Sequence, residues 1–182
     1  MVTKIDTKFS RTSRHVASVA LAAAAGVLLA SCAVPAPGPV ARTGAPTAMI
    51  SSTVTVPAGY DTIYLSGTTG TLPPPAGSPP GTPGPDSGDT EAQAVRALEK
   101  IQGLLKEQGL GLGDIVMMHA YLSADPKTGR GDSAGWGNAF KKYFGTSEQP
   151  NKPSRTSVTV VLGGPTTKIE IETIAVRKPA AK

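Results

Sequence analysis

The sequence has little of what metal sites, covalent catalysis and disulfide frameworks require. Among its 182 residues there is one cysteine, Cys32, and there are two histidines, His15 and His119. Because no cysteine follows position 32, the rest of the chain must fold on its hydrophobic core without disulfides. One histidine after the leader and no free thiol exclude a zinc site and the Cys/His and Ser/His/Asp catalytic sets. We expect no metal and no cofactor.

Aromatic side chains are also scarce, and positive charge is low once the first residues are set aside. Aromatics make up 4% of the chain. The net charge is +5, but residues 1–31 contain four Lys or Arg and one Asp, which leaves about +2 for the remainder. Proteins that bind nucleic acid use basic patches and stacking aromatics. We therefore expect no nucleic-acid partner, and RNA cleavage is the least favoured activity.

No apolar run is long enough to span a bilayer comfortably. The longest, residues 16–30, follows a basic leader and ends in Leu29-Ala30-Ser31-Cys32. This pattern resembles a bacterial lipoprotein signal, with residues 1–31 removed and Cys32 lipidated. The alternative is ordinary cleavage nearby, with Cys32 discarded or left as a free thiol. Ala33 stands where Asp would signal inner-membrane retention, so we expect an exported, lipid-anchored protein on the periplasmic face of the outer membrane.

Proline and glycine are abundant, at 17 and 21 residues, and they concentrate in two stretches. Residues 33–46 form a Pro/Ala-rich stretch that predicts a semi-extended, structureless tether. Residues 72–88 lack periodicity and predict a surface loop. The expected organisation is a tether over residues 32–50, a domain over 51–178 with a Pro/Gly-rich insertion at about 72–88, and a tail over 179–182.

The periodic segments predict strands and helices in a definite order. Residues 52–56 and 62–66 predict two strands separated by a hairpin-type interruption. A helix opens at Thr90 and Gln93, which match a capping box, or at Asp89 as the competing cap, and Gly109 ends it. Its expected buried face comprises Ala94, Ala97, Leu98, Ile101, Leu104 and Leu105.

The second half predicts a strand over residues 114–122, a helix over 133–144 and two closing strands. The closing strands, about 153–162 and 168–176, are joined by a turn at Gly163-Gly164-Pro165. The order ββαβαββ predicts an α+β fold in which one mixed sheet is covered on one face by two helices.

The closing strands also carry the candidate chemistry. Arg155 stands at the start of the first, and Glu170 and Glu172 alternate along the second. An arginine can grip a carboxylate with two parallel hydrogen bonds, and a glutamate can orient a water molecule or pass a proton. An edge-strand arginine with two solvated glutamates is the plain structural alternative. His119 lies on an alternating strand and is interpreted as packed or hydrogen-bonded rather than catalytic.

Several blocks together resemble the RidA/YjgF family of reactive-intermediate (imine/enamine) deaminases. The resemblance covers roughly residues 52–177. It rests on Ile63-Tyr64-Leu65-Ser66-Gly67, Glu91-Ala92-Gln93, Gly113-Asp114-Ile115-Val116, Asn138 with Tyr143-Phe144-Gly145, Pro153-Ser154-Arg155-Thr156 and Lys168-Ile169-Glu170-Ile171-Glu172.

The resemblance implies a chorismate-mutase-like fold and a homotrimer with three clefts between subunits. It implies hydrolysis of 2-imino or 2-enamino acids to 2-keto acids and ammonia without a cofactor. Arg155 would bind the substrate carboxylate and Glu170 would help position the attacking water, while Ser66, Asn138 and Ser157 would line the cleft. The sequence departs from the family at Thr53, where a substrate-contacting tyrosine is usual, and at Thr68, where glutamine is usual.

Two functional hypotheses follow. The first is a lipid-anchored imine/enamine deaminase of the cell envelope. The second is a catalytically inactive trimeric module that uses Arg155 to bind a small carboxylate or a protein partner.

Overall fold

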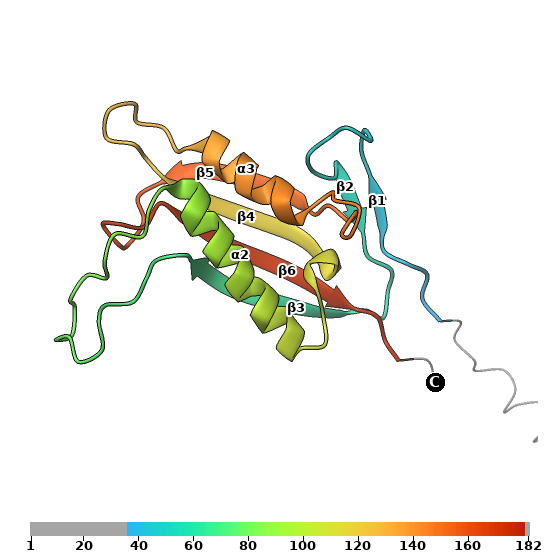
Figure 1. The fold of residues 1–182 in the computed structure, drawn as a ribbon. Coiled ribbons are helices and arrows are strands. Elements are labelled where there is room, and N and C mark those ends of the chain that lie inside the picture. Colours follow the sequence, from blue (N-terminus) through green and yellow to red (C-terminus); the bar gives the residue numbers. More distant parts are fainter. Residues whose placement is uncertain (1–35, 181–182) are drawn as a thin grey trace, which may run out of the picture. The chain divides into compact units, whose positions relative to one another are not determined.

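The structure, a computed structural model, describes residues 36–180. The expected signal peptide and Cys32 lie outside the described residues, as does the end of the expected tail. Residues 37–180 belong to one compact unit, in which two helices cover one face of a four-stranded sheet (Figure 1). No helix within residues 36–180 has the length and apolar character needed to cross a membrane.

The four-stranded sheet is mixed, which confirms the predicted α+β fold with two helices. Its strands lie in the order β3 (Asp61–Thr69), β6 (Ile169–Arg177), β4 (Ile115–Ser123) and β5 (Ser154–Val160). Only the β4–β5 pair among them is parallel. Helix α2 (Thr90–Glu107) and the short turn η2 (Leu112–Asp114) connect β3 to β4, and helix α3 (Ser133–Tyr143) connects β4 to β5. Such helical crossovers are the usual way to join parallel strands.

The two closing strands do not pair with each other, because β4 separates β5 from β6. Strand β6 lies inside the sheet, paired with both β3 and β4, whereas β5 forms an edge. The burial of the two strands fits these places. Alternate β6 residues from Ile169 to Ala175 are buried, but most of β5 is exposed. Local sequence predicts strands and turns, while the choice of partner depends on how much apolar surface each strand buries in the whole sheet.

The hairpin predicted from residues 52–56 and 62–66 is wrong. Strand β2 (Thr53–Thr55) pairs antiparallel with β1 (Ala41–Thr43) in a separate two-stranded sheet. Because β1 lies within the predicted structureless tether, ordered structure begins earlier than expected. Arg42 ties β1 to the start of β4, since its Nη2 donates to the carbonyl oxygens of Gly113 (2.9 Å) and Ile115 (3.3 Å). Contacts across more than 70 positions leave no local signal in a Pro/Ala-rich segment.

Helix α2 begins and ends at the expected places, although its cap is the competing one. Asp89 is the N-cap, and its carboxylate accepts a hydrogen bond from the backbone N–H of Ala92 (2.8 Å). Gly109 follows the helix with a φ of +71°, the left-handed conformation that favours glycine. Leu104 is 45% exposed, so its predicted burial is wrong. The adjacent Leu105 takes the position that faces the sheet and is fully buried.

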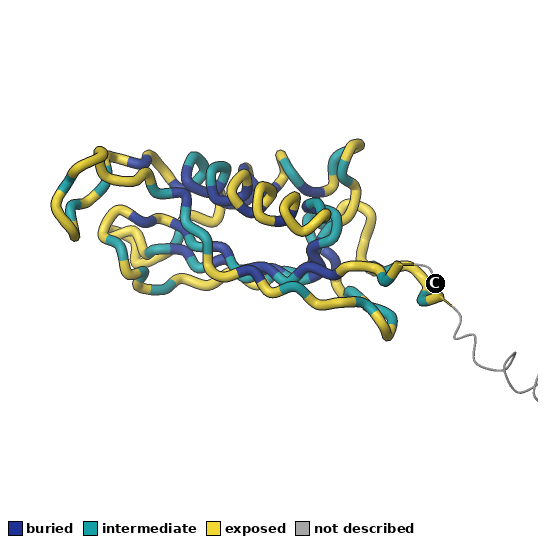
Figure 2. Tube along the Cα trace, turned by 90° about the horizontal axis from the view of Figure 1, so that it is seen from below, coloured by how far each residue is buried: buried dark blue, intermediate teal, exposed yellow. Residues whose placement is uncertain are grey.

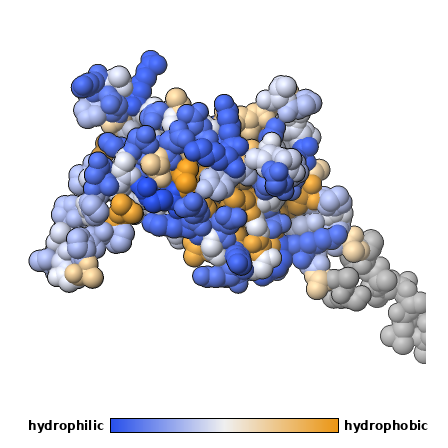
Figure 3. Space-filling model, viewed as in Figure 1, coloured by the Kyte–Doolittle hydropathy of each residue, from blue (hydrophilic) through white to orange (hydrophobic). Residues whose placement is uncertain are grey.

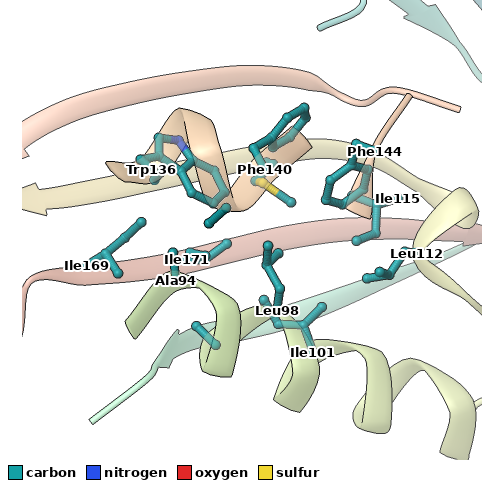
Figure 4. Close-up of a cluster of buried hydrophobic side chains, with 14 of the residues drawn as sticks. Ala94, Leu98, Ile101, Leu112, Ile115, Trp136, Phe140, Phe144, Ile169 and Ile171 are labelled. Carbon is teal, nitrogen blue, oxygen red and sulfur yellow. The ribbon is translucent and has the colours of Figure 1, made fainter. Parts of the chain in front are cut away.

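The core lies between the two helices and the sheet. Figure 2 shows the buried segments concentrated in this layer. Figure 4 shows Trp136, Phe140 and Phe144 projecting from α3 toward the β strands, opposite Leu98 and Ile101 of α2. The outer surface of the helices is mostly hydrophilic, with small hydrophobic areas between (Figure 3). We call the covered side of the sheet the helix face and the other side the open face.

Candidate active site

Arg155 is placed on the helix face by its position in the sheet. It pairs in register with Met118 of β4, whose side chain is fully buried under the helices. The carbon at the centre of its guanidinium group lies 4.4 Å from the ring centre of Phe140 and 5.2 Å from that of Trp136. These two rings stand four residues apart on α3 and therefore share one side of the helix. They form an aromatic platform under the cation.

The Arg155 guanidinium has no acidic partner within the described part of the chain. The ion pairs found among residues 36–180 do not include it. Its Nη2 atom donates to the sulfur of Met49 at 3.6 Å, and its Nη1 atom is shielded from solvent with no hydrogen-bond acceptor in residues 36–180. Burial lowers the pKa of Arg155. An arginine remains charged at any physiological pH, so the site holds a positive charge without an acid to balance it.

Ser157, expected to line the cleft, lies on the same strand two residues after Arg155. Its Oγ accepts a hydrogen bond from Nε1 of Trp136 at 3.1 Å. Trp136 thus connects the two β5 residues, because its ring lies under Arg155 and its nitrogen fixes Ser157. The sequence analysis did not identify Trp136 as a site residue. The available signal was the four-residue spacing of the only tryptophan and Phe140.

Glu170 and Glu172 lie on the open face, opposite to Arg155. In register, Glu170 pairs with Tyr121 and Glu172 pairs with His119. Glu172 accepts hydrogen bonds from the Tyr121 hydroxyl (2.9 Å) and lies 3.4 Å from Nδ1 of His119. The hydrogen bond to Glu172 is the main cause that raises the pKa of Tyr121. His119 is therefore hydrogen-bonded, as predicted, and the two glutamates have different surroundings.

Glu170 packs against the Ser66-Gly67 segment instead. Strand β3 is irregular between Leu65 and Thr68, and a Cβ atom added at Gly67 would overlap the Glu170 carboxylate. Any side chain at position 67 would therefore require the Glu170 carboxylate to move. The candidate residues Ser66 and Glu170 are thus brought close to one another, while Arg155 and Glu170 stand on opposite faces of the same chain.

Asn138 is turned toward α2 instead of toward Arg155. Its Nδ2 donates to Glu91 at 3.1 Å, and Lys142 pairs with the same carboxylate at 2.7 Å. These two partners, Lys142 first, lower the pKa of Glu91. Asn138 follows Trp136 by two residues, which is more than half a turn around α3. Its position explains why it lies apart from the aromatic platform.

The described residues offer little to a metal ion. Within residues 36–180, no three His, Cys, Asp or Glu side chains gather closely enough to ligate one. The polar groups near Arg155 are instead a hydroxyl, an indole N–H and a thioether. This set suits a small anion with an organic body.

Comparison with known proteins places this arrangement in a family. The sequence model of the family described as Endoribonuclease L-PSP matches residues 45–177, most of the chain. The chain belongs to the RidA/YjgF family. The predicted resemblance is confirmed at this level, including its fold.

Curated relatives of this RidA/YjgF member include a RutC family protein of Pyrococcus abyssi, 33% identical over 91 residues. Another is TdcF of Escherichia coli, 33% identical over 89 residues, which carries the provisional name of a reactive intermediate deaminase. The alignments cover 50% and 49% of this chain and 65% and 64% of the relatives. The chain thus spans slightly less than two thirds of their length.

A solved structure shows the same fold. The Rid family protein YyfB of Yersinia pestis has a TM-score of 0.52 at 19% identity, covering 69% of this chain and 85% of that one. Escherichia coli TdcF, solved with bound serine, has a TM-score of 0.48 at 28% identity, covering 67% and 84%.

Proposed function

We propose that this RidA/YjgF member hydrolyses 2-imino or 2-enamino acids to 2-keto acids and ammonia, with Arg155 binding the substrate carboxylate. One observation carries the proposal. The Arg155 guanidinium is half-buried on an aromatic platform without an acid partner in the described residues. Withdrawing a charge from water is costly unless a counter-charge is supplied. A substrate carboxylate would supply it, in the bidentate geometry that guanidinium groups favour.

Hydrolysis of an imine requires few further groups in the site. An imine carbon bonded to a protonated nitrogen is already electrophilic. Water adds to it, the resulting carbinolamine loses ammonia, and the C=O bond of the keto acid forms. A site that fixes the acid and places the water can accelerate this sequence through proximity and a weak base. Ser157 lies beside Arg155 to contact the substrate, and Glu170 is the candidate for the water.

The opposite placement of Arg155 and Glu170 requires a second copy of the chain. A cleft between subunits, as the family resemblance implies for a homotrimer, would join the helix-face Arg155 of one copy to Glu170 of its neighbour. Exposed apolar side chains on the open face and its edges, Tyr64 (75% exposed) and Val158 (43% exposed), support burial against another copy.

The test is hydrolysis of imino acids that an amino-acid oxidase produces in situ. We expect wild type to accelerate the loss of the imine and Arg155→Ala to abolish the acceleration. Arg130→Ala is the matched control, since it removes an exposed arginine from the 124–132 loop. If the purified trimer accelerates none of several imino acids, the enzyme proposal is wrong.

A catalytically inactive binding module is the second candidate, and one observation favours it. Thr53 and Thr68 stand where the family commonly has tyrosine and glutamine, and Thr68 donates its hydroxyl hydrogen to the Ser66 carbonyl (3.1 Å). If the protein binds carboxylates through Arg155 but does not hydrolyse imines, the binding-module hypothesis is supported. The family description also names an endoribonuclease, but the low charge and few aromatics argue against RNA.

We further propose that the protein is exported and anchored to the envelope membrane through a lipid on Cys32, on the periplasmic face. The leader pattern of residues 1–32 supports this proposal. Mass spectrometry of the mature N-terminus tests it. We expect the first residue to be a diacylated or triacylated Cys32. An unmodified Cys32, or a mature chain that lacks it, would contradict the anchor.

A further inference from the structure

Met49 contacts the Arg155 guanidinium at Nη2, from a different segment of the chain than the aromatic platform. The platform of Trp136 and Phe140 covers the cation from α3, and the Met49 sulfur accepts the Nη2 hydrogen from the segment between β1 and β2. The Nη1 atom is shielded from solvent in this arrangement. In the state described here, Nη2 is therefore paired with the Met49 sulfur and Nη1 is out of contact with solvent.

The contact between Met49 and Arg155 is weak compared with what a carboxylate offers. A thioether sulfur is a poor hydrogen-bond acceptor, whereas a carboxylate forms short, charge-assisted bonds with guanidinium. The Nη2 atom of Arg155 is bonded to a poor acceptor, and its Nη1 atom has no acceptor within residues 36–180. A carboxylate would satisfy both, so it would displace the sulfur at little cost.

The backbone around Met49 is held to the segment that precedes Arg155. The Lys152 ammonium donates to the carbonyl oxygens of Ala48 (2.6 Å) and Pro46 (3.2 Å). On the other side, the Ser51 N–H donates to the Pro153 carbonyl (3.1 Å) and its hydroxyl donates to the Lys152 carbonyl (2.6 Å). With both flanks fixed, the movable part is the side chain of Met49, which has three rotatable bonds beyond Cα.

The surroundings leave this side chain room to move. The Met49 methyl lies next to Gly137 of α3, where a Cβ atom would be 3.8 Å away. Because glycine has no side chain, α3 does not obstruct Met49 at this position. Beside it is a cavity of about 450 Å³ that Met49 lines together with Thr47, Lys141, Phe144 and Lys152. The cavity can accept the methionine side chain when it leaves the guanidinium.

We propose that Met49 is the gate of the Arg155 anion site. Its thioether closes the empty site and turns toward the adjoining cavity when a carboxylate binds. The inference rests on the proposed role of Arg155, and it adds that access to this cation is controlled by one residue of the β1–β2 connection. It also makes Met49 a determinant of which substrates enter, because a larger substrate body requires a wider displacement.

The test measures binding of propionate, a carboxylate with no imine, to the full-length protein through the emission of Trp136, the single tryptophan. We expect Met49→Ala to bind propionate about tenfold more tightly than wild type (~1.4 kcal/mol) and with a faster association rate. Met49→Leu keeps the cover and should remain within about threefold of wild type. Leu104→Ala, at an exposed apolar position on α2, should equal wild type.

A second readout follows the methyl groups of 13C-labelled methionine by NMR. We expect propionate to shift the resonance that Met49→Ala removes and to leave that of Met117, on the open face of β4, unchanged. Unchanged or weaker propionate binding in Met49→Ala would overturn the gate. A response that survives Arg155→Ala would instead overturn the anion site and with it the proposed function.

Discussion

Charged side chains on the two faces of the sheet have different surroundings. On the helix face, Arg155 is held by aromatic rings and a thioether with no acid within residues 36–180. On the open face, Glu172 is satisfied by Tyr121 and His119, and Glu170 packs against Gly67. Arg155, which has no acidic partner in residues 36–180, and Glu170, which has no basic partner there, are therefore separated by the thickness of the sheet. Under the proposed function, a single chain carries two halves of a site that neighbouring copies complete.

The largest expected effect comes from combining the two halves. Arg155→Ala and Glu170→Gln should each reduce imine hydrolysis by at least about 100-fold, because a charged contact to the reacting molecule is lost (~2.7 kcal/mol). Unfolded and refolded together in equal amounts, the two inactive variants should regain about a quarter of wild-type activity if neighbouring copies in a closed ring share each site. No recovery by the mixed trimer would show that the two residues do not act across subunits.

A large effect on activity is also expected from substitution of Gly67 on the open face. Gly67→Ala introduces a methyl group that overlaps the Glu170 carboxylate. We expect activity to fall strongly because the Glu170 carboxylate must turn away, and the free energy of unfolding to change by less than about 1 kcal/mol, since the end of a half-buried, flexible side chain can move. Urea denaturation and the imine assay measure the two effects.

The control is Gly103→Ala on α2, where an added Cβ meets nothing within 4 Å. It should raise the free energy of unfolding by about 0.5–1 kcal/mol, since alanine favours a helix over glycine. Equal behaviour of the two variants would contradict the close approach of Glu170 to Gly67.

On the helix face, Trp136→Phe should have a moderate effect. The change keeps a ring under Arg155 but removes the Nε1–H that donates to Ser157. We expect the free energy of unfolding to fall by about 1–2 kcal/mol and KM to rise more than kcat falls. Ser157→Ala, which removes only the acceptor, should reproduce part of the change in KM. A loss confined to kcat would argue against a role in holding the carboxylate.

The smallest expected effect is a pH dependence on the open face. The pKa of Tyr121 is raised in the folded protein, chiefly by its hydrogen bond to Glu172. A group whose folded pKa lies above its unfolded value of 10.0 stabilises the fold below that pH and stops doing so as pH rises through the folded pKa. Stability should therefore decline above about pH 10, and Tyr121→Phe should reduce that decline. Urea midpoints between about pH 8 and 11 measure it.

Much of the fold could be predicted because it depends on local patterns. The α2 helix followed from its apolar spacing and from Gly109, and the β4 alternation correctly separated His119 and Tyr121 from the buried Met118 and Leu122. Strand pairing could not be predicted in this way. The hairpin predicted from residues 52–56 and 62–66 was wrong because nearness in sequence was taken for nearness in the sheet, and the place of β6 between β3 and β4 was not predicted.

The site shows the same division. Arg155, Ser157, Glu170 and Ser66 were identifiable from their motifs, and the family assignment made from them is confirmed. The aromatic platform, the cover by Met49 and the orientation of Asn138 were not identifiable, since each depends on how α3 and residues 45–52 pack on β5. Their roles remain predictions until the experiments above are done.

By itself, the sequence indicated where the two helices and most of the strands lie and which family the chain belongs to. Its single cysteine, few histidines and motif residues are properties of the chain that folding does not alter. Only the tertiary structure decided which residues meet. Alternation along a strand assigns side chains to two sides, but pairing across the sheet fixes which side carries the helices. That pairing put Arg155 under Met49 and Glu170 on the opposite face.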